Sequence, residues 1–322
     1  MRIFLWFLVM IPLITVAHPG IGIVQDSKGN IYYTDLEQVW KIAKNGSRSV
    51  VVKNVHTHEL YMDGADNLFG EHLWYNGEKI DTWGYYVWCL KNNGTLDTVI
   101  KPSTGFLTNY SFVRDSAGNM YWVERSSVSQ FKKKSVDGKI ETIAQGKFKD
   151  IRWMHATANG KVYFVDYHDL YKISPNGKYV LIAKDITGHS AASTKLNGGR
   201  HSLFGVWTDR NDNIYIASYS GGVVKQISQT GEVKNLVYST KPWAPTGGLF
   251  DEDGNLWVLE ASVTNTVRVR KVLKQDVGLQ KKSLHNKNFI PVLLSIGFLL
   301  LLGGIGWFIK SVKRFTNGVH QI

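Results

Sequence analysis

The stretch H-T-H-E-L-Y-M-D, from His56 to Asp63, concentrates side chains that can bind a metal ion or exchange a proton. It contains His58 and Glu59, and a further imidazole follows at His72. Imidazole and carboxylate groups together suit a divalent cation, zinc or calcium in character, which could acidify a water molecule or polarise a carbonyl. The residue types therefore predict a metal site of His58, Glu59 and His72. The same groups could equally bind a ligand without a metal.

These residues belong to a repeated phrase that must position them. The phrase D-S-K-G-N-I-Y-Y-T-D at Asp26–Asp35 is a turn signal followed by an apolar and aromatic run, which predicts a β-hairpin. Its further copies begin at Asp63, Asp115, Thr157, Asp209 and Asp251. The copies lie 37 to 52 residues apart, and a four-stranded propeller blade needs ~40–45 residues. Six copies with no helical pattern between them predict an all-β, six-bladed β-propeller of four-stranded antiparallel blades over residues 18–272.

One copy carries a family resemblance. The phrase P-T-G-G-L-F-D-E-D-G-N-L-W, from Pro245 to Trp257, resembles the blades of the NHL-repeat and gluconolactonase-like (SMP-30) six-bladed propellers. The likeness covers most of the chain and implies the fold, which hosts lactonases, lyases, synthases and binding modules. The lyase propellers of this group place a metal-binding His five residues before the blade Asp in three blades, and here only His58 fills that slot. The gluconolactonases open their first blade with a metal-binding Glu, whereas the nearest Glu here is Glu59, in the second blade.

In a propeller, the loops entering the innermost strand and those leaving the second strand surround one mouth of the central channel. The repeat places one residue of each blade in each of two rings there. The first ring is predicted to contain Ile21, His58, Tyr110, Arg152, Phe204 and Thr246, and the second Asp35, His72, Glu124, Asp166, Ser218 and Glu260.

Roles follow from these positions. Catalytic roles are predicted for His58, Glu59, Arg152 and Tyr110. Ligand contacts are predicted for Asp35, Glu124, Asp166, Tyr219, Glu260 and, from a polar insertion at Thr187–Ser202, His201. The alternative for each strand-end acid is a structural role, in which it accepts hydrogen bonds from backbone amides.

Both ends of the chain read as membrane-targeting segments. Residues 1–17 have one Arg, an apolar run and small residues at a plausible cleavage site, which predicts a signal peptide. Residues 289–309 are uncharged and long enough to span a bilayer as a helix. A basic stalk over residues 273–288 and a cytoplasmic tail over residues 310–322 complete the predicted domains. We expect the propeller to lie outside the membrane, because the signal peptide directs it to export. The positive charge of the stalk would by the positive-inside rule favour the opposite orientation, but the signal peptide is the stronger indication.

The distribution of charge along the chain indicates which classes of partner to expect. The net charge is +12, but eight Lys and Arg with a single acid lie from Lys271 onward, beside the predicted span. This charge suits anionic lipid head groups, so nucleic acid is not expected as a partner. Cys89 is the only cysteine, which excludes an intramolecular disulfide and a cysteine-rich zinc site.

The sequence leaves two main functional hypotheses and a third, weaker one. The first is a membrane-anchored, extracytoplasmic propeller that binds a small molecule, sugar, peptide or envelope protein at the channel mouth. The alternative is a metal-dependent hydrolase or lyase, lactonase-like, that uses a divalent Ca or Zn ion. The third is an assembly protein that recruits partners through an aromatic surface of Trp74, Trp83 and Trp88.

Overall fold

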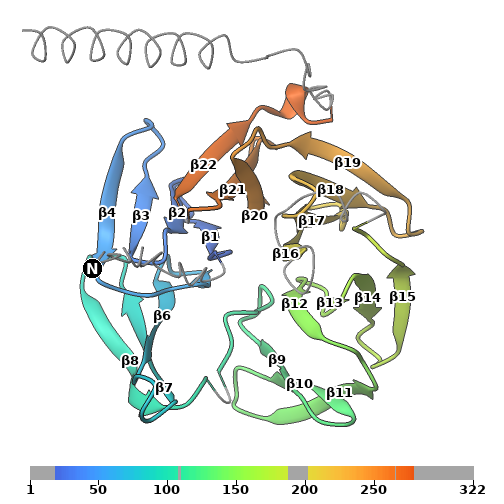
Figure 1. The fold of residues 1–322 in the computed structure, drawn as a ribbon, viewed down its shortest axis with the longest axis horizontal. Coiled ribbons are helices and arrows are strands. Elements are labelled where there is room, and N and C mark those ends of the chain that lie inside the picture. Colours follow the sequence, from blue (N-terminus) through green and yellow to red (C-terminus); the bar gives the residue numbers. More distant parts are fainter. Residues whose placement is uncertain (1–18, 108–109, 188–201, 265, 279–322) are drawn as a thin grey trace, which may run out of the picture. The chain divides into compact units, whose positions relative to one another are not determined.

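Six antiparallel sheets surround a common axis (Figure 1). The structure is a computed structural model that describes residues 19–107, 110–187, 202–264 and 266–278. Four of the sheets have four strands, in sequence order from the axis outward. They are β1 (Ile23–Gln25), β2 (Ile31–Thr34), β3 (Gln38–Ile42) and β4 (Arg48–Lys53) in blade one; β5 (Leu60–Met62), β6 (Leu68–Tyr75), β7 (Trp83–Leu90) and β8 (Leu96–Thr104) in blade two; β12 (Ile151–Ala156), β13 (Val162–Asp166), β14 (Asp169–Ile173) and β15 (Tyr179–Ala183) in blade four; and β16 (Leu203–Thr208), β17 (Ile214–Ser218), β18 (Val223–Ile227) and β19 (Val233–Tyr238) in blade five.

Blades three and six have three strands each among the described residues, where four were predicted. They are β9 (Met120–Glu124), β10 (Ser129–Lys134) and β11 (Ile140–Gly146), and β20 (Trp243–Phe250), β21 (Leu256–Ser262) and β22 (Val267–Val272). In blade three the innermost strand is reduced to one bridge, Arg114 to Met120. Figure 1 shows the segment before β9 running on the inner side of that strand. The six-bladed propeller is confirmed, and blade three leaves its inner wall to an irregular segment.

The repeated phrase forms hairpins because its Asp closes the turn. In blade one, Asp26 Oδ1 accepts the amides of Lys28 and Asn30, at 3.0 and 2.8 Å. Its Oδ2 accepts the Asn30 side-chain amide at 2.6 Å and the Tyr32 hydroxyl at 3.1 Å. Blades three and five repeat all four bonds. The Asp, Asn and Tyr of the phrase are therefore a structural unit.

Replacing the buried Asp26 by Ala removes four acceptor contacts and leaves their donors unpaired, a loss of about 2–3 kcal/mol in the free energy of unfolding. We expect Asp26→Ala to lower the melting temperature by about 5–10 °C in a circular dichroism melt. The exposed Asp137, which accepts the Lys139 amide at 3.1 Å, provides the control: Asp137→Ala should melt with the wild type. Equal melting of the two variants would contradict the role of the turn.

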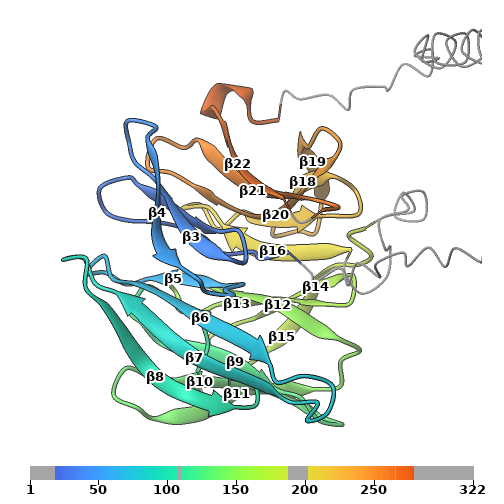
Figure 2. The ribbon, with the colours of Figure 1, turned by 60° about the vertical axis from the view of Figure 1, so that its left-hand side comes forward.

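Apolar side chains between neighbouring sheets form the core. One cluster joins blades one and two through Val39, Val52, Leu60, Leu68 and Trp88. Figure 2 shows the corresponding sheets face to face, with β5 and β6 beside β3 and β4.

Among the described residues, blades one and six are joined by packing and by a close backbone contact, and they share no strand. Leu259 of blade six packs against Ile23, Ile31 and Tyr33 of blade one. At Gly247, a Cβ would lie 2.4 Å from the Ile21 carbonyl oxygen, so only glycine permits the two innermost strands to approach this closely. Side-chain packing and this backbone contact therefore replace the missing fourth strand of blade six.

One predicted boundary differs in detail from the structure. The first part of the predicted stalk belongs to the propeller, since the short 3-10 helix η2 (Lys274–Asp276) follows β22 and the Lys274 amide donates to Asn255 Oδ1 at 3.1 Å.

No helix within residues 19–107, 110–187, 202–264 and 266–278 has the length and apolar character to cross a membrane. The predicted signal peptide, span and tail lie outside the described residues, and these remain predictions.

Candidate functional site

The segment that enters β5 is held by hydrogen bonds from blade one. The carbonyl oxygen of His58 accepts the amides of Ile21 and Gly22, each at 2.9 Å. The Thr34 hydroxyl donates to the Thr57 carbonyl at 2.7 Å. These bonds tie the segment to blade one, so the side chains of His58 and Glu59 have a rigid backbone support.

Glu71, on β6, is the centre of the site. Its side chain is buried, with the residue only 3% exposed. Its Oε1 accepts the amides of His58 and Glu59 at 2.6 and 3.3 Å and lies 3.6 Å from Nδ1 of His58. Its Oε2 is buried and has no hydrogen-bond partner among the described residues. A buried carboxylate oxygen without a donor is costly, so this oxygen is prepared for a proton or for a donor from a ligand.

Burial sets the charge of the group. It raises the pKa of Glu71 to about 7, and it raises the pKa of Glu59 to about 7 with a contribution from the nearby Glu71 carboxyl. Burial also lowers the pKa of His58 to about 4. Near neutral pH the imidazole is therefore uncharged and the two carboxyls are partly ionised. Glu59 keeps part of its surface exposed, whereas Glu71 is almost completely buried.

His72 is directed into a different environment. Its Nδ1 accepts the amide of His56 at 3.0 Å, and its ring stacks with those of Tyr86 and Trp74 at centroid distances of 5.0 and 5.8 Å. The structure thus brings His58 and Glu59 together with Glu71, while His72 belongs to an aromatic stack. Within the part of the chain that is described, no three His, Cys, Asp or Glu side chains are placed to hold a metal ion. The donor set does not fit the predicted metal.

Three of the four strand-end acids have structural partners, and two of them, Asp35 and Asp166, accept backbone amides as the alternative prediction described. Asp35 accepts the Trp40 indole N–H at 2.6 Å, and Asp166 accepts the Asp150 amide at 2.6 Å. Glu260 is completely buried between Arg268 and Arg270. Glu124 is exposed and lies 3.4 Å from the Lys132 amine.

The remaining predicted residues have partners as well. Arg152 pairs with Asp150 at 2.8 Å, and the Tyr219 ring packs edge-on to Phe204 with centroids 5.2 Å apart. Tyr110 packs against Phe112 and lies under the guanidinium of Arg114. His201 lies outside the described residues.

Because the ring position of blade two is His72, the predicted rings do not include the preceding residue, Glu71. The equivalent residue of the other blades is Thr34, Val123, Val165, Ala217 or Leu259. A carboxylate in a slot that is apolar in four of the five other blades is a departure from the repeat, and that signal could have found it.

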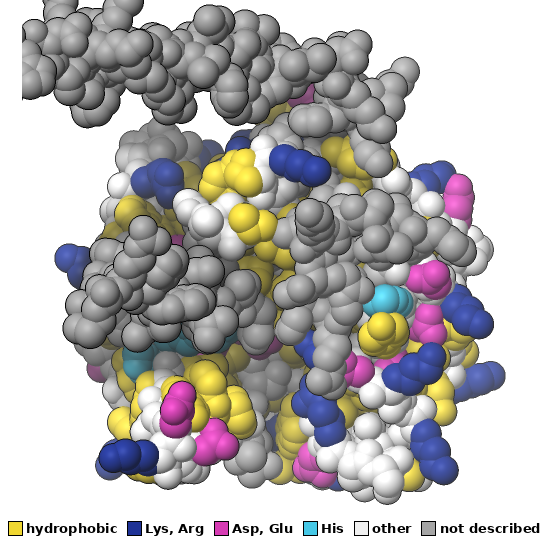
Figure 3. Space-filling model, in the orientation of Figure 1, with side chains coloured by type: hydrophobic (Ala, Val, Ile, Leu, Met, Phe, Trp, Pro, Cys, Tyr) yellow, Lys and Arg dark blue, Asp and Glu magenta, His cyan; other side chains and the backbone are white. Residues whose placement is uncertain are grey.

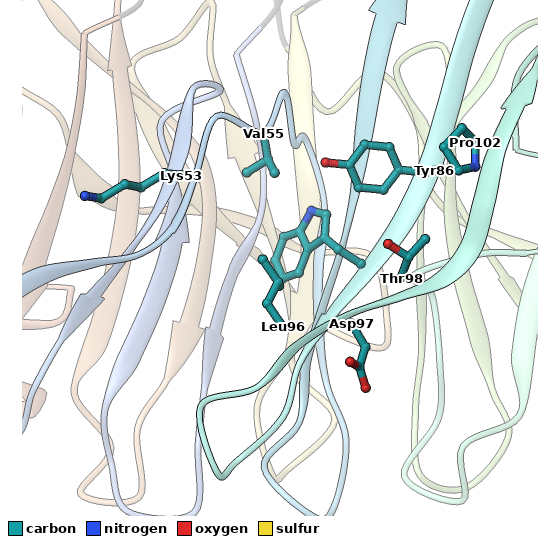
Figure 4. Close-up of a pocket in the computed structure, with 8 residues that line it drawn as sticks. Lys53, Val55, Tyr86, Leu96, Asp97, Thr98 and Pro102 are labelled. Atoms are coloured by element: carbon teal, nitrogen blue, oxygen red, sulfur yellow. The ribbon is translucent and has the colours of Figure 1, made fainter.

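The aromatic residues of blade two support this site more than they form a surface. Trp88 is 1% exposed and donates its indole N–H to the Glu71 carbonyl at 3.1 Å, so it is not available to recruit a partner. A pocket of about 200 Å³ lies between the outer strands of blades one and two (Figure 4), lined by Lys53, Val55, Tyr86, Trp88, Leu96, Asp97, Thr98 and Pro102. Figure 3 shows hydrophobic side chains gathered over blade two and Lys and Arg side chains spread around the rim of that face.

Known proteins share the fold. No family model matches the chain, and no curated protein matches its sequence. Among solved structures the chain is similar to a luciferin-regenerating enzyme, with a TM-score of 0.50 and 13% identity over 81% of this chain and 92% of that one. It is also similar to virginiamycin B lyase from Staphylococcus aureus, with a TM-score of 0.46 and 12% identity over 79% and 84% of the two chains. For the calcium-binding protein regucalcin from Agrobacterium tumefaciens, the TM-score is 0.44 and the identity 14% over 75% and 83%. The predicted resemblance to these propellers is confirmed for the fold, and function must be argued from the site.

Proposed function

We propose that the protein is a membrane-anchored, extracytoplasmic propeller that binds a small ligand at the wall of its channel. The ligand presents a protonated amine or a similar organic cation to Glu59 and Glu71. The single observation that supports this most is the Oε2 atom of Glu71, which is buried without a donor beside a second carboxyl. A cationic N–H donor satisfies that oxygen and relieves the repulsion between the two acids.

The neutral state of His58 favours this assignment. An uncharged imidazole next to Glu71 does not compensate the carboxylate charge, so the charge remains available to a ligand. The membrane location rests on the predicted signal peptide and span. A sugar or a protein partner would use hydrogen bonds more than charge, and the raised pKa of two adjacent carboxyls favours the cation.

The alternative is a metal-dependent hydrolase or lyase, for which His58, Glu59 and His72 are the predicted ligands. These residues do not converge as a metal set within the described part of the chain, so we derive no reaction from them. Metal analysis of the purified protein separates the two functions. Stoichiometric Zn or Ca that disappears in His58→Ala would replace the cation-binding proposal with the metal-dependent one.

The binding test uses benzylamine as the cation and benzyl alcohol as its uncharged analogue, titrated calorimetrically into the full-length protein in detergent. Because the carboxyl pKa values are about 7, ionisation between pH 6 and pH 8 should tighten benzylamine binding roughly tenfold. Glu71→Gln should weaken binding at pH 8 at least tenfold. The exposed Glu124 supplies the control, since Glu124→Gln should bind as the wild type does. Binding of benzyl alcohol as tight as that of benzylamine would contradict the proposal.

A further inference from the structure

The guanidinium of Arg114 lies between two tyrosine rings at the junction of blades two and three. Its Cζ is 5.0 Å from the ring centroid of Tyr61 and 4.9 Å from that of Tyr110. Tyr61 is on β5, the innermost strand of blade two. The other two residues belong to the irregular segment that takes the place of the innermost strand in blade three (Figure 1). All three residues are partly exposed.

The guanidinium of Arg114 also donates a side-chain hydrogen bond to the Tyr110 hydroxyl, which uses part of its five N–H groups. Among the described residues Arg114 forms no ion pair, whereas the half-buried Arg152, Arg268 and Arg270 each pair with a carboxylate. An arginine presents five N–H donors in a planar fork that matches a carboxylate, and stacking between rings restricts its side-chain rotamers. A guanidinium that is fixed in this way loses little conformational entropy when it binds a planar anion.

We propose that Arg114 is a carboxylate-binding subsite of the same channel wall. The inference rests on the proposed function, which it extends by naming a second group of the ligand. Tyr61, which stacks on Arg114, follows Glu59 by two residues on one segment, so the acidic pair and the guanidinium belong to one stretch of wall. A molecule that carries both an amine and a carboxylate, as amino acids and short peptides do, fits the two subsites.

The experiment uses benzoate, which has the carboxylate and lacks the amine, titrated into the full-length protein in detergent. Arg114→Gln should weaken benzoate binding at least tenfold. Arg114→Lys should lose most of that affinity, because an ammonium keeps the charge without the fork. Arg125, which donates to the Ile151 carbonyl at 2.8 Å and stacks on no ring, supplies the matched control, and Arg125→Gln should bind benzoate normally. A circular dichroism melt of each variant confirms that the fold is retained.

The two subsites fail separately. Benzylamine should bind Arg114→Gln as tightly as it binds the wild type. A variant that loses benzoate binding and keeps benzylamine binding therefore tests the carboxylate subsite independently of the amine subsite. Both Arg114→Gln and Glu71→Gln should weaken binding of the peptide Gly-Gly-Gly at least tenfold. The carboxylate subsite is wrong if benzoate does not bind the wild type, if it binds Arg114→Gln equally well, or if inorganic phosphate binds as tightly as benzoate. If only one of the two variants weakens binding of the tripeptide, the proposal that one ligand occupies both subsites is wrong.

Discussion

Glu260→Ala should lower the free energy of unfolding by about 3 kcal/mol, the lower end of the range for a broken buried ion pair. The Glu260 carboxylate is completely buried and accepts Arg268 Nε at 2.6 Å, Arg270 Nη2 at 2.9 Å and the Ser239 hydroxyl at 2.6 Å. Its removal leaves two guanidinium groups without their carboxylate. Both arginines keep some contact with water, with side-chain exposures of 34% and 24%, which limits the loss.

The size of this effect follows from the place of Glu260 in the fold. Ser239 follows the last strand of blade five, and the two arginines are on β22, the last strand of blade six. Because blade six has no fourth strand among the described residues, this cluster links its outer strand to the preceding blade. In a thermal melt followed by circular dichroism we expect the midpoint to fall by about 6–12 °C. Glu124→Ala should change it by roughly 1 °C or less, because its ion pair is exposed. A similar shift for the two variants would show that the buried cluster adds no stability.

The second large effect is a dependence of stability on pH that Glu71 causes. A carboxyl whose pKa is about 7 in the folded protein and 4.5 in the unfolded chain binds more protons when folded between these two pH values. The free energy of unfolding therefore falls as the pH rises from about 4.5 to 7 and stays low above that range. For a shift of this size the loss is up to about 3 kcal/mol.

Glu71→Gln should remove most of this dependence, because a glutamine resembles the protonated acid and does not ionise. Urea unfolding at pH 5 and pH 8 provides the measurement, with the wild type losing stability between the two and the variant losing much less. Glu59→Gln offers the comparison. Glu59 has its own raised pKa, to which burial and the charge of Glu71 contribute, so its replacement should also flatten the dependence in part. His58, whose pKa is lowered to about 4, gains stability over part of the same range, so the contribution of Glu71 is the difference between the wild type and Glu71→Gln. If the two proteins changed in stability by the same amount between pH 5 and pH 8, the assigned pKa of Glu71 would be wrong.

The fold could be predicted from the sequence because the blade motif is local. The contacts of Asp26, Asn30 and Tyr32 all lie within seven residues, so the hairpin is specified wherever the phrase recurs. Blade three shows the limit of this reasoning. Its phrase at Asp115 is intact, yet the segment before it forms only one bridge, since pairing of an innermost strand depends on packing against the neighbouring blades as well as on the turn.

The site was predicted only in part for a related reason. Equivalent positions in a repeat share a place in the backbone, but the partners of a side chain come from neighbouring blades. Asp166 and Glu260 occupy equivalent slots and have different partners, a backbone amide and two arginines. Glu59 was found because its segment departs from the repeat. Glu71 and Arg114 were missed because each depends on contacts with a segment that precedes it in the chain.

The last strand fixes where a tether leaves the propeller. Val272, at the end of β22, pairs with Leu256 beside the turn of the sixth hairpin, so the chain departs from the side that carries the Asp and Asn turns. The carboxyls of Glu59 and Glu71 lie toward the other end of the inner strands, where the chain enters β5. The end of the last described strand and the two carboxyls therefore lie at opposite ends of the blades.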